Sequence, residues 1–232
     1  MKQIALVGIN GYIGSALFEK LRKNKKYNVT GVTRDNYSIF QKKSYDLVIN
    51  AAMPSKRLWA EQNPLLDFDE TVKKTADLVY TWQYKKFIQI STISARSELD
   101  RVYGRNKAAA ERICLDDKNL IFRLTSTFGD RLTKGSVIDI LNGQKVWVDG
   151  RSRYSFASLE FVTSWISENL DRKGIVEVGA RNSLSLERIA HYLGVKVSFQ
   201  GKVDHQIVKN PLPEFPDARE ILKYLKMRIN KI

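Results

Sequence analysis

The chain has few of the residues that build disulfides and metal sites, and it has no long apolar segment. Its single cysteine, Cys114, excludes an internal disulfide. Its two histidines, His191 and His205, lie far apart and have no companion cysteines, so we expect no metal site. No apolar run approaches the ~18 residues that a membrane-spanning helix needs, so we expect no membrane span.

The rest of the composition is that of a compact globular protein. The 232 residues contain no repeat and no low-complexity segment, and a chain of this length can bury a sizeable core in one domain, with or without a small appendage. The first apolar run, Ile4–Val7, is the expected first strand and leaves no room for a signal peptide before it. We therefore expect a cytoplasmic protein.

Basic residues outnumber acidic ones, and the net charge is +14. Such a protein can bind nucleic acid, an anionic membrane surface or acidic small molecules. The lysines form scattered pairs, such as Lys25-Lys26 and Lys85-Lys86, rather than one block. Scattered charge is typical of a solvated surface, so we do not expect nucleic acid as a partner. A generally positive field would also favour a ligand that carries a diphosphate.

The pattern of apolar residues predicts alternating strands and helices in the first half of the chain. Strands are expected near residues 3–8, 28–33, 46–51, 86–91 and 119–125, with helices over 11–23, 64–82 and 102–115. This alternation predicts an α/β fold with a doubly wound parallel sheet. Five residues of the third helix recur at helical spacing and are predicted to face the sheet: Leu65, Phe68, Val72, Ala76 and Val79.

The pattern becomes looser after residue 129. Short helices over 135–142, 158–170 and 185–193 are expected between strands over 145–148, 175–178 and 195–199. We therefore predict a dinucleotide-binding domain over 1–129 and, over 130–232, mostly a small α+β region that is not an independent domain.

A glycine-rich turn follows the first predicted strand. Gly8, Gly11 and Gly14 have the spacing Gly-x-x-Gly-x-x-Gly, and a segment of helical period begins directly after them. Glycine allows positive φ in the turn and lets a pyrophosphate approach the helix N-terminus closely. A strand, a glycine turn and a helix in this order predict a dinucleotide site.

Two further motifs place polar groups where chemistry is expected. The strand Phe87–Ile90 ends in Ser91 and Thr92, and strand carboxyl ends are where open parallel sheets bind ligands. Tyr103 and Lys107 are four residues apart in an expected helix, so they share one face. A phenol titrates near pH ~10 on its own, and an ammonium beside it lowers its pKa.

These three motifs, in this order, resemble those of the short-chain dehydrogenase/reductase superfamily, and the glycine spacing resembles its extended branch, the NAD(P)-dependent epimerase/dehydratase family. The segment Tyr45–Ala52 is similar to the fourth strand of that family, and Val148–Arg153 to a loop that binds substrate phosphate. The likeness covers residues 2 to about 190. Ser126 stands where the family usually has asparagine, and the third strand and its helix look trimmed. The Tyr-Gly-x-x-Lys run also resembles 4-keto-sugar reductases of the dehydrorhamnose type.

The resemblance implies three sets of site residues. The catalytic set is Tyr103, Lys107 and Thr92. The cofactor-binding set comprises Gly8, Asn10, Gly11, Tyr12, Ile13, Gly14, Thr33, Arg34, Ala51, Ala52, Ser91 and Lys107. The substrate-binding set is Lys56, Ser126 and Arg153, although a surface salt bridge is an equally good reading of Arg153. In such a site Lys107 would hold the nicotinamide ribose and lower the pKa of Tyr103, and Thr92 would orient the substrate oxygen.

The end of the second strand bears on the choice of cofactor. NAD-binding proteins place an acid there, on the ribose 2′-hydroxyl. This chain has Arg34 at that position, and a guanidinium is suited to a 2′-phosphate. We therefore expect NADP rather than NAD, although Asp35 would supply the acid if the strand ran one residue further.

The expected function is that of an NADP-dependent oxidoreductase or epimerase acting on a nucleotide-linked keto-sugar. Relatives return the segment that corresponds to 158–180 to the main sheet, which makes the second region a substrate-binding cap, and many of them form homodimers through the helices that correspond to 64–82 and 102–115. The alternative is a dinucleotide-binding sensor or scaffold of the same fold. The presence of Tyr103, Lys107 and Thr92 together argues against it, because a sensor does not need all three.

Overall fold

The computed structural model describes residues 1–229, and the chain divides into two compact units. The first unit comprises Met1–Leu124 and Thr163–Val176, and the second comprises Thr125–Val162 and the chain from Glu177 onward. The first unit therefore ends before the predicted boundary at 129, and the segment of the second half that belongs to it is 163–176.

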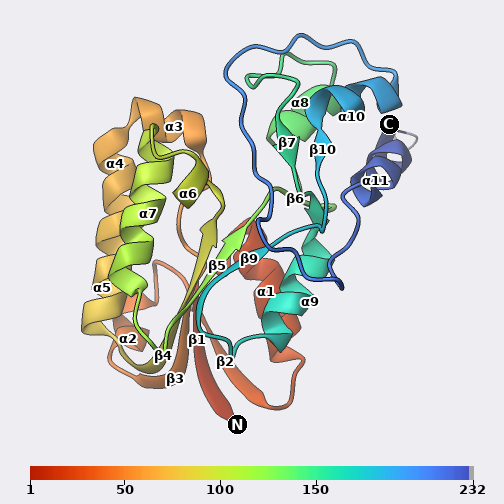
Figure 1. Ribbon diagram of the computed structural model, residues 1–232. Coiled ribbons are helices and arrows are strands. Elements are labelled where there is room, and N and C mark those ends of the chain that lie inside the picture. The colour runs from red at the N-terminus through yellow and green to blue at the C-terminus, as the bar shows by residue number, and fades with distance from the viewer. Residues whose placement is uncertain (230–232) are drawn as a thin grey trace. The chain divides into compact units, whose positions relative to one another are not determined.

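The first unit is built on a six-stranded sheet with the order β2-β1-β3-β4-β5-β9 (Figure 1). Its strands are β1 (Lys2–Val7), β2 (Tyr27–Val32), β3 (Ser44–Asn50), β4 (Gln83–Thr92), β5 (Leu120–Leu124) and β9 (Gly174–Val178). The pairs β1–β2, β1–β3, β3–β4 and β4–β5 are all parallel. Since β1 lies between β2 and β3, the order of winding reverses beside β1, and the predicted doubly wound α/β fold is confirmed.

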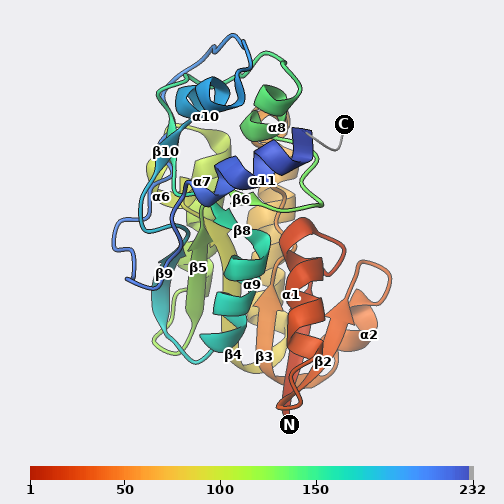
Figure 2. The same cartoon turned by 90° about the vertical axis from the view of Figure 1, so that its right-hand side faces the viewer.

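Helices cover both faces of this sheet because its central strands are apolar on both sides. Ile4, Leu6, Val48 and Ile49 are all fully buried. One face is covered by α1 (Tyr12–Arg22) and by the part of α9 (Leu159–Glu168) that belongs to this unit (Figure 2). The other face is covered by α4 (Pro64–Phe68), α5 (Lys74–Thr81) and α7 (Val102–Cys114), as Figure 1 shows.

The helix predicted over 64–82 is interrupted. A π-helical turn, η1 (Asp69–Lys73), joins α4 to α5 and changes which side chains face inward. The prediction that Leu65 and Phe68 face the sheet is wrong, since they are 79% and 46% exposed. The inward face is formed instead by four residues spaced by three or four positions: Asp67, Thr71, Thr75 and Leu78.

Three short helices connect the larger elements. α2 (Tyr37–Gln41) occupies the region expected to be trimmed, and its Tyr37 and Phe40 pack against the core cluster that includes Trp82. α3 (Arg57–Gln62) follows β3, and α6 (Ser94–Ser97) follows β4. Neither α3 nor α6 was predicted, because helices of six and four residues are too short to show a period in the sequence.

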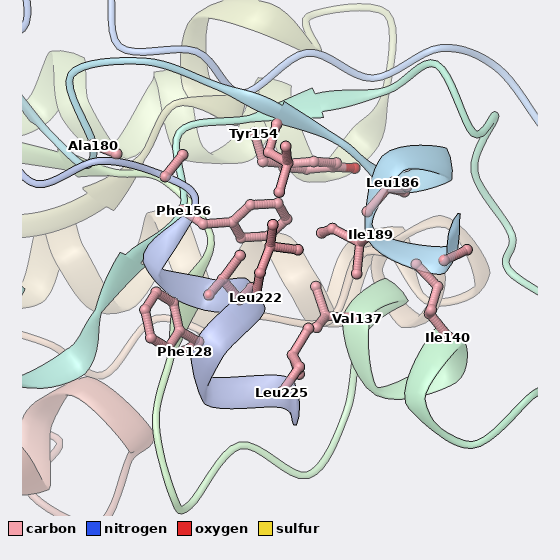
Figure 3. Packing of buried hydrophobic residues seen from close by; sticks show 14 of the residues in the cluster. Phe128, Val137, Ile140, Tyr154, Phe156, Ala180, Leu186, Ile189, Leu222 and Leu225 are labelled. Atoms are coloured by element: carbon pink, nitrogen blue, oxygen red, sulfur yellow. The ribbon is translucent and has the colours of Figure 1, made fainter. Parts of the chain in front are cut away.

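The second unit has its own apolar core (Figure 3). Its helices are α8 (Ser136–Leu141), α10 (Leu186–Leu193) and α11 (Glu220–Ile229). Two short ladders pair β6 (Thr127–Phe128) with β8 (Ala157–Ser158), and β7 (Arg153–Tyr154) with β10 (Leu184–Ser185). The core gathers side chains from each of these elements except β8, and it includes Phe128, Tyr154, Phe156, Leu222 and Leu225.

The prediction of regular strands over 145–148 and 195–199 is wrong. These segments meet only at one isolated parallel bridge, between Val146 and Phe199. Val146 is fully buried, and Phe199 packs against the core of the unit as a partly buried side chain. The apolar residues that suggested strands therefore serve packing, and the backbone around them is irregular.

Candidate active site

The predicted glycine turn lies at the switch point of the sheet, between β1 and α1. Gly8 has a φ of +91°, and a Cβ on it would lie 2.7 Å from the backbone of Ala52. A Cβ on Gly14 would lie 2.1 Å from the carbonyl oxygen of Gly8. These two glycines therefore let the turn pack tightly against both helix α1 and the loop after β3, where Ala51 N donates a hydrogen bond to Val7 O.

Gly11 has a different role in the turn. It is the N-cap residue of α1, has extended φ and ψ and is exposed. A Cβ on it would touch only the Gly8 oxygen, at 3.3 Å, and the Ala51 oxygen, at 3.8 Å. The backbone from Gly11 to Gly14 is thus open on its outer side at a helix N-terminus, which is the environment that a pyrophosphate needs. Of the other turn residues of the predicted cofactor set, Tyr12 and Ile13 lie in this segment and Asn10 directly precedes it.

The end of β2 is fixed by an asparagine that the sequence analysis overlooked. Asn36 accepts a hydrogen bond from Thr33 N at 2.8 Å and donates one to Gly31 O at 3.2 Å. The Arg34 side chain is 86% exposed and pairs with Glu70 of η1 at 3.2 Å. Thr33 and Arg34 therefore lie at the carboxyl edge of the sheet, near a carboxylate from the π-helical turn.

Tyr103 and Lys107 are both buried on α7, at 6% and 2% exposure. The Lys107 ammonium lies 5.0 Å from the centre of the Tyr103 ring. Its Nζ donates hydrogen bonds to Pro54 O at 2.7 Å and to Thr71 Oγ1 at 3.4 Å. The loop after β3 and the π-helical turn together hold this lysine in place.

The expectation that Lys107 lowers the pKa of Tyr103 is wrong in this structure. Burial raises the pKa of the Tyr103 phenol to about 12, and the cation that acts against this rise is Arg57. Burial also lowers the pKa of Lys107 to about 7, against a smaller opposing effect of Asp67. The same apolar surroundings that bring the two groups together disfavour the charged form of each.

Thr92 lies at the end of β4 and is half-buried. Its Oγ1 accepts a hydrogen bond from Ser94 N at 3.3 Å and lies 3.4 Å from Ser94 Oγ. Ser94 Oγ in turn accepts a hydrogen bond from the Arg57 guanidinium at 3.1 Å. Thr92 is thus connected through Ser94 to Arg57.

Ser91 differs from the other predicted site residues because its hydroxyl is used inside the fold. It donates to Glu111 Oε1 at 2.6 Å, and Glu111 also pairs with Arg123 through Oε2 at 2.6 Å. Strand alternation points Ser91 and Thr92 to opposite faces of the sheet. The structure therefore gives the Ser91 side chain an interior partner.

The predicted substrate residues are distributed over both units. Lys56 is exposed in the first unit, at the start of α3, with its ammonium 5.9 Å from the Trp59 ring centre. Ser126 and Arg153 belong to the second unit. Ser126 is half-buried, and Arg153 donates hydrogen bonds to the hydroxyl and the carbonyl of Ser183 at 3.0 and 2.9 Å.

The sequence analysis missed Arg57, Ser94 and Glu98, which adjoin Tyr103. A signal existed for Arg57, since it follows Lys56 in the loop after a predicted strand. The sequence holds no such signal for Glu98, because its position depends on how closely its backbone approaches Gly104 in the fold. A Cβ on Gly104 would lie 2.1 Å from Glu98 O. Gly104 therefore lets α7 rest directly on the backbone after α6.

Among residues 1–229, no group of three histidine, cysteine, aspartate or glutamate side chains could hold a metal ion. No helix in the same range is both long enough and apolar enough to cross a membrane.

Solved structures of known proteins share this fold. Two dTDP-4-dehydrorhamnose reductases are similar: one from Clostridium acetobutylicum (17% identity, TM-score 0.78) and one from Bacillus anthracis in complex with NADP (16%, 0.76), each with 98% of this chain and 99% of the other covered. UDP-glucose 4-epimerase from Thermotoga maritima is also similar, at 18% identity and a TM-score of 0.75, with 98% of this chain and 97% of the other covered. At these identities the likeness supports the fold alone.

Sequence comparison gives the family. No curated protein matches the chain directly. The model of the NAD dependent epimerase/dehydratase family, however, matches residues 4–158, which is about two thirds of the chain and includes the glycine turn, the end of β4 and the Tyr103/Lys107 pair. The chain therefore belongs to the NAD-dependent epimerase/dehydratase family.

Proposed function

We propose that this protein is an NADP-dependent enzyme that reduces or epimerises a nucleotide-linked keto-sugar, with Tyr103, Lys107 and Thr92 as its catalytic residues. The observation that supports this most directly is the buried Tyr103/Lys107 pair, with the ammonium 5.0 Å from the ring centre. Lys107 is tied to Pro54, in the loop that follows the carboxyl end of β3, beside the open glycine turn. A binding protein of the same fold would have no need to bury a lysine against a phenol.

The residues present fit a dinucleotide. The outer side of Gly11 is open, and the backbone of residues 11–14 would bind the pyrophosphate at the N-terminus of α1. Arg34 would bind a 2′-phosphate in a bidentate manner in exchange for its exposed contact with Glu70. Ala51 and Ala52, with their small side chains, leave room along the end of β3. Lys107 would exchange its hydrogen bond to Pro54 O for the nicotinamide ribose.

The bound nicotinamide would supply hydride transfer, and the protein would handle the proton. A phenol whose pKa is raised to about 12 is protonated at neutral pH, so Tyr103 is ready to donate a proton to a carbonyl oxygen. Thr92, at the end of β4, would hold the same oxygen by a hydrogen bond. In the reductive direction, in which the carbonyl becomes an alcohol, a protonated Tyr103 would supply the proton.

The substrate class rests on the family and on the basic residues at the site. The similar solved proteins act on dTDP- and UDP-linked sugars according to their names. A nucleotide-linked sugar has a diphosphate. Lys56 is its candidate ligand in the first unit, and Arg153 and Ser126 are separate candidates in the second unit. Arg153 already binds Ser183, but a guanidinium has five N–H donors, so further ones remain for a phosphate.

The proposal is tested in two steps with purified protein. Fluorescence titration first compares NADPH with NADH, and tight NADPH binding that survives moderate salt is expected. Loss of NADPH absorbance is then followed with a panel of dTDP- and UDP-linked 4-keto-sugars, with Tyr103→Phe as the matched inactive control. Binding of NADPH without turnover of any sugar, together with equal behaviour of the Tyr103→Phe variant, would favour the sensor alternative.

A further inference from the structure

Arg57, at the start of α3, makes three contacts around Tyr103. Its NH1 pairs with Glu98 Oε1 at 3.2 Å, and its NH2 donates to Ser94 Oγ at 3.1 Å. The centre of its guanidinium lies 5.9 Å from the centre of the Tyr103 ring, within reach of a cation–π interaction. The Arg57 side chain therefore connects three groups: Ser94, which is hydrogen-bonded to Thr92, the Glu98 carboxylate and the Tyr103 phenol.

The pair between Arg57 and Glu98 is more than a surface salt bridge. The Glu98 side chain is only 8% exposed, and the Arg57 side chain is 35% exposed. A carboxylate buried to this degree needs a cation beside it, because its charge is poorly hydrated. The backbone of Glu98 also supports α7, where Gly104 packs against it with no room for a Cβ. Arg57 thus holds the segment against which the helix of Tyr103 is packed.

Three charged side chains shift the pKa of Tyr103 from the elements around it. Arg57 of α3 lowers the pKa of the phenol, whereas Glu98 after α6 and Asp67 of α4 raise it. Lys107 lies on the same helix, but burial lowers its own pKa to about 7, so its ammonium is only partly charged at neutral pH. A guanidinium stays charged at any working pH.

One more carboxylate lies near the start of the helix. Glu61 of α3 accepts a hydrogen bond from Val102 N at 2.9 Å, so its charge is engaged with the N-terminus of α7, one residue before Tyr103. It is present in every variant considered below and leaves their comparison unchanged.

We propose that Arg57 is a positioning residue of this site, which orients Tyr103 through Ser94 and Glu98 and supplies the permanent positive charge beside its ring. The inference builds on the proposed role of Tyr103 and adds that α3 supplies the permanently charged cation beside this phenol.

Two substitutions separate the charge of Arg57 from its part in the packing. Arg57→Gln and Glu98→Gln both remove the same ion pair and leave amides of similar size. If the pair were merely structural, the two variants would disturb Tyr103 in the same way. If charge matters, Arg57→Gln raises the pKa of Tyr103 and Glu98→Gln lowers it, because the first removes a positive and the second a negative neighbour. Arg57→Lys keeps the charge and should lie close to the unaltered protein.

The measurement needs neither cofactor nor substrate. Residue 103 alone is replaced by 3,5-difluorotyrosine, whose more acidic phenol brings the titration into the range in which the protein stays folded, and its 19F resonance is followed against pH. We expect shifts of roughly one to two pH units in opposite directions for the two glutamine variants, as for the removal of one nearby charge in each. Circular dichroism checks that each variant is folded.

Shifts of the same sign, or no shift in either variant, would overturn the proposal. If Arg57→Gln fails to fold, the comparison of Glu98→Gln with Arg57→Lys decides: a lowered pKa in the first and an unchanged pKa in the second supports the proposal, and any other pair of results contradicts it. This test measures the titration of residue 103 and needs no substrate. A failure to find a sugar substrate would therefore count against the proposed function but would not change the result for Arg57. With a substrate, the same signs are expected in the pH profile of kcat.

Discussion

The burial of Lys107 makes a quantitative prediction about stability. Its ammonium is 2% exposed, and burial lowers its pKa from the ordinary 10.5 to about 7. In the unfolded chain the same group is hydrated and titrates at its ordinary value. Between pH 7 and 10.5 the unfolded state therefore binds a proton that the folded state lacks, and the free energy of unfolding rises with pH in that window.

The expected size follows from the two pKa values. A difference from 10.5 to about 7 corresponds to roughly 4–5 kcal/mol over the whole window, at about 1.4 kcal/mol per pH unit. Between pH 6.5 and pH 9.5 the contribution of Lys107 should rise by about 3 kcal/mol. Lys107→Met removes this contribution and keeps a side chain of similar length. It also leaves Pro54 O and Thr71 Oγ1 without their donor, which costs about 1–3 kcal/mol at every pH.

The assay is urea unfolding of the cofactor-free protein at several pH values, followed by circular dichroism. The stability of the unaltered protein minus that of Lys107→Met should increase by about 3 kcal/mol from pH 6.5 to pH 9.5. The loss of the hydrogen bonds to Pro54 and Thr71 is the same at every pH, so it does not affect the change in this stability difference between pH 6.5 and pH 9.5. Lys118→Met, at an exposed lysine, is the matched control and should show a constant offset. A flat difference for Lys107→Met would refute the reasoning, and a difference that falls with pH would mean that the pKa of Lys107 is raised.

Three further outcomes are expected. Gly11→Val should leave the fold intact, because a Cβ there touches only carbonyl oxygens at 3.3 Å and beyond, but should abolish dinucleotide binding in an equilibrium titration; retained binding would place the cofactor elsewhere. Arg34→Ala should weaken NADPH by roughly 1.5–3 kcal/mol and leave NADH nearly unchanged, and equal affinities for the two in the unaltered protein would contradict the choice of NADP. Tyr103→Phe should keep NADPH affinity and stability but lower kcat by about 10²–10⁴-fold, whereas full turnover would exclude this phenol as the proton donor.

The elements that the sequence predicted are those whose burial repeats in a regular way. The strands around Ile4, Val48 and Ile88 are apolar on both faces, so their position and parallel pairing follow from composition alone. The site motifs were also visible, because their spacing is fixed by chain geometry: one helical turn for Tyr103 and Lys107, and one tight turn for the glycines. These are local constraints, and a sequence shows local constraints well.

What the sequence did not show depends on contacts between distant segments. The π-helical turn at 69–73 moves Leu65 and Phe68 outward and Asp67 and Thr71 inward, and nothing in the apolar pattern indicates it. The pKa of Tyr103 depends on how many charges surround it and how deeply it is buried. Lys107 was expected to lower that pKa from the spacing of the two residues alone. Spacing does not show that burial removes both groups from water, which raises the pKa of Tyr103 and lowers that of Lys107.

The irregular parts of the first unit hold Lys107 in place. Its hydrogen-bond acceptors are a carbonyl in the loop after β3 and a hydroxyl in the π-helical turn, and they hold the ammonium in an interior where a charge is costly. A sequence selected only for stability would place an apolar residue there, so the lysine indicates a functional constraint. The same reasoning explains why the contact with Pro54 matters for binding. A ligand hydroxyl that replaces the Pro54 carbonyl would accept the same hydrogen bond from Lys107, so the exchange costs little. Without any acceptor, the lysine would either remain as a buried unpaired charge or give up its proton. In the proposed site, the free protein already bears the cost of burying this lysine, and a ligand would take over an existing hydrogen bond.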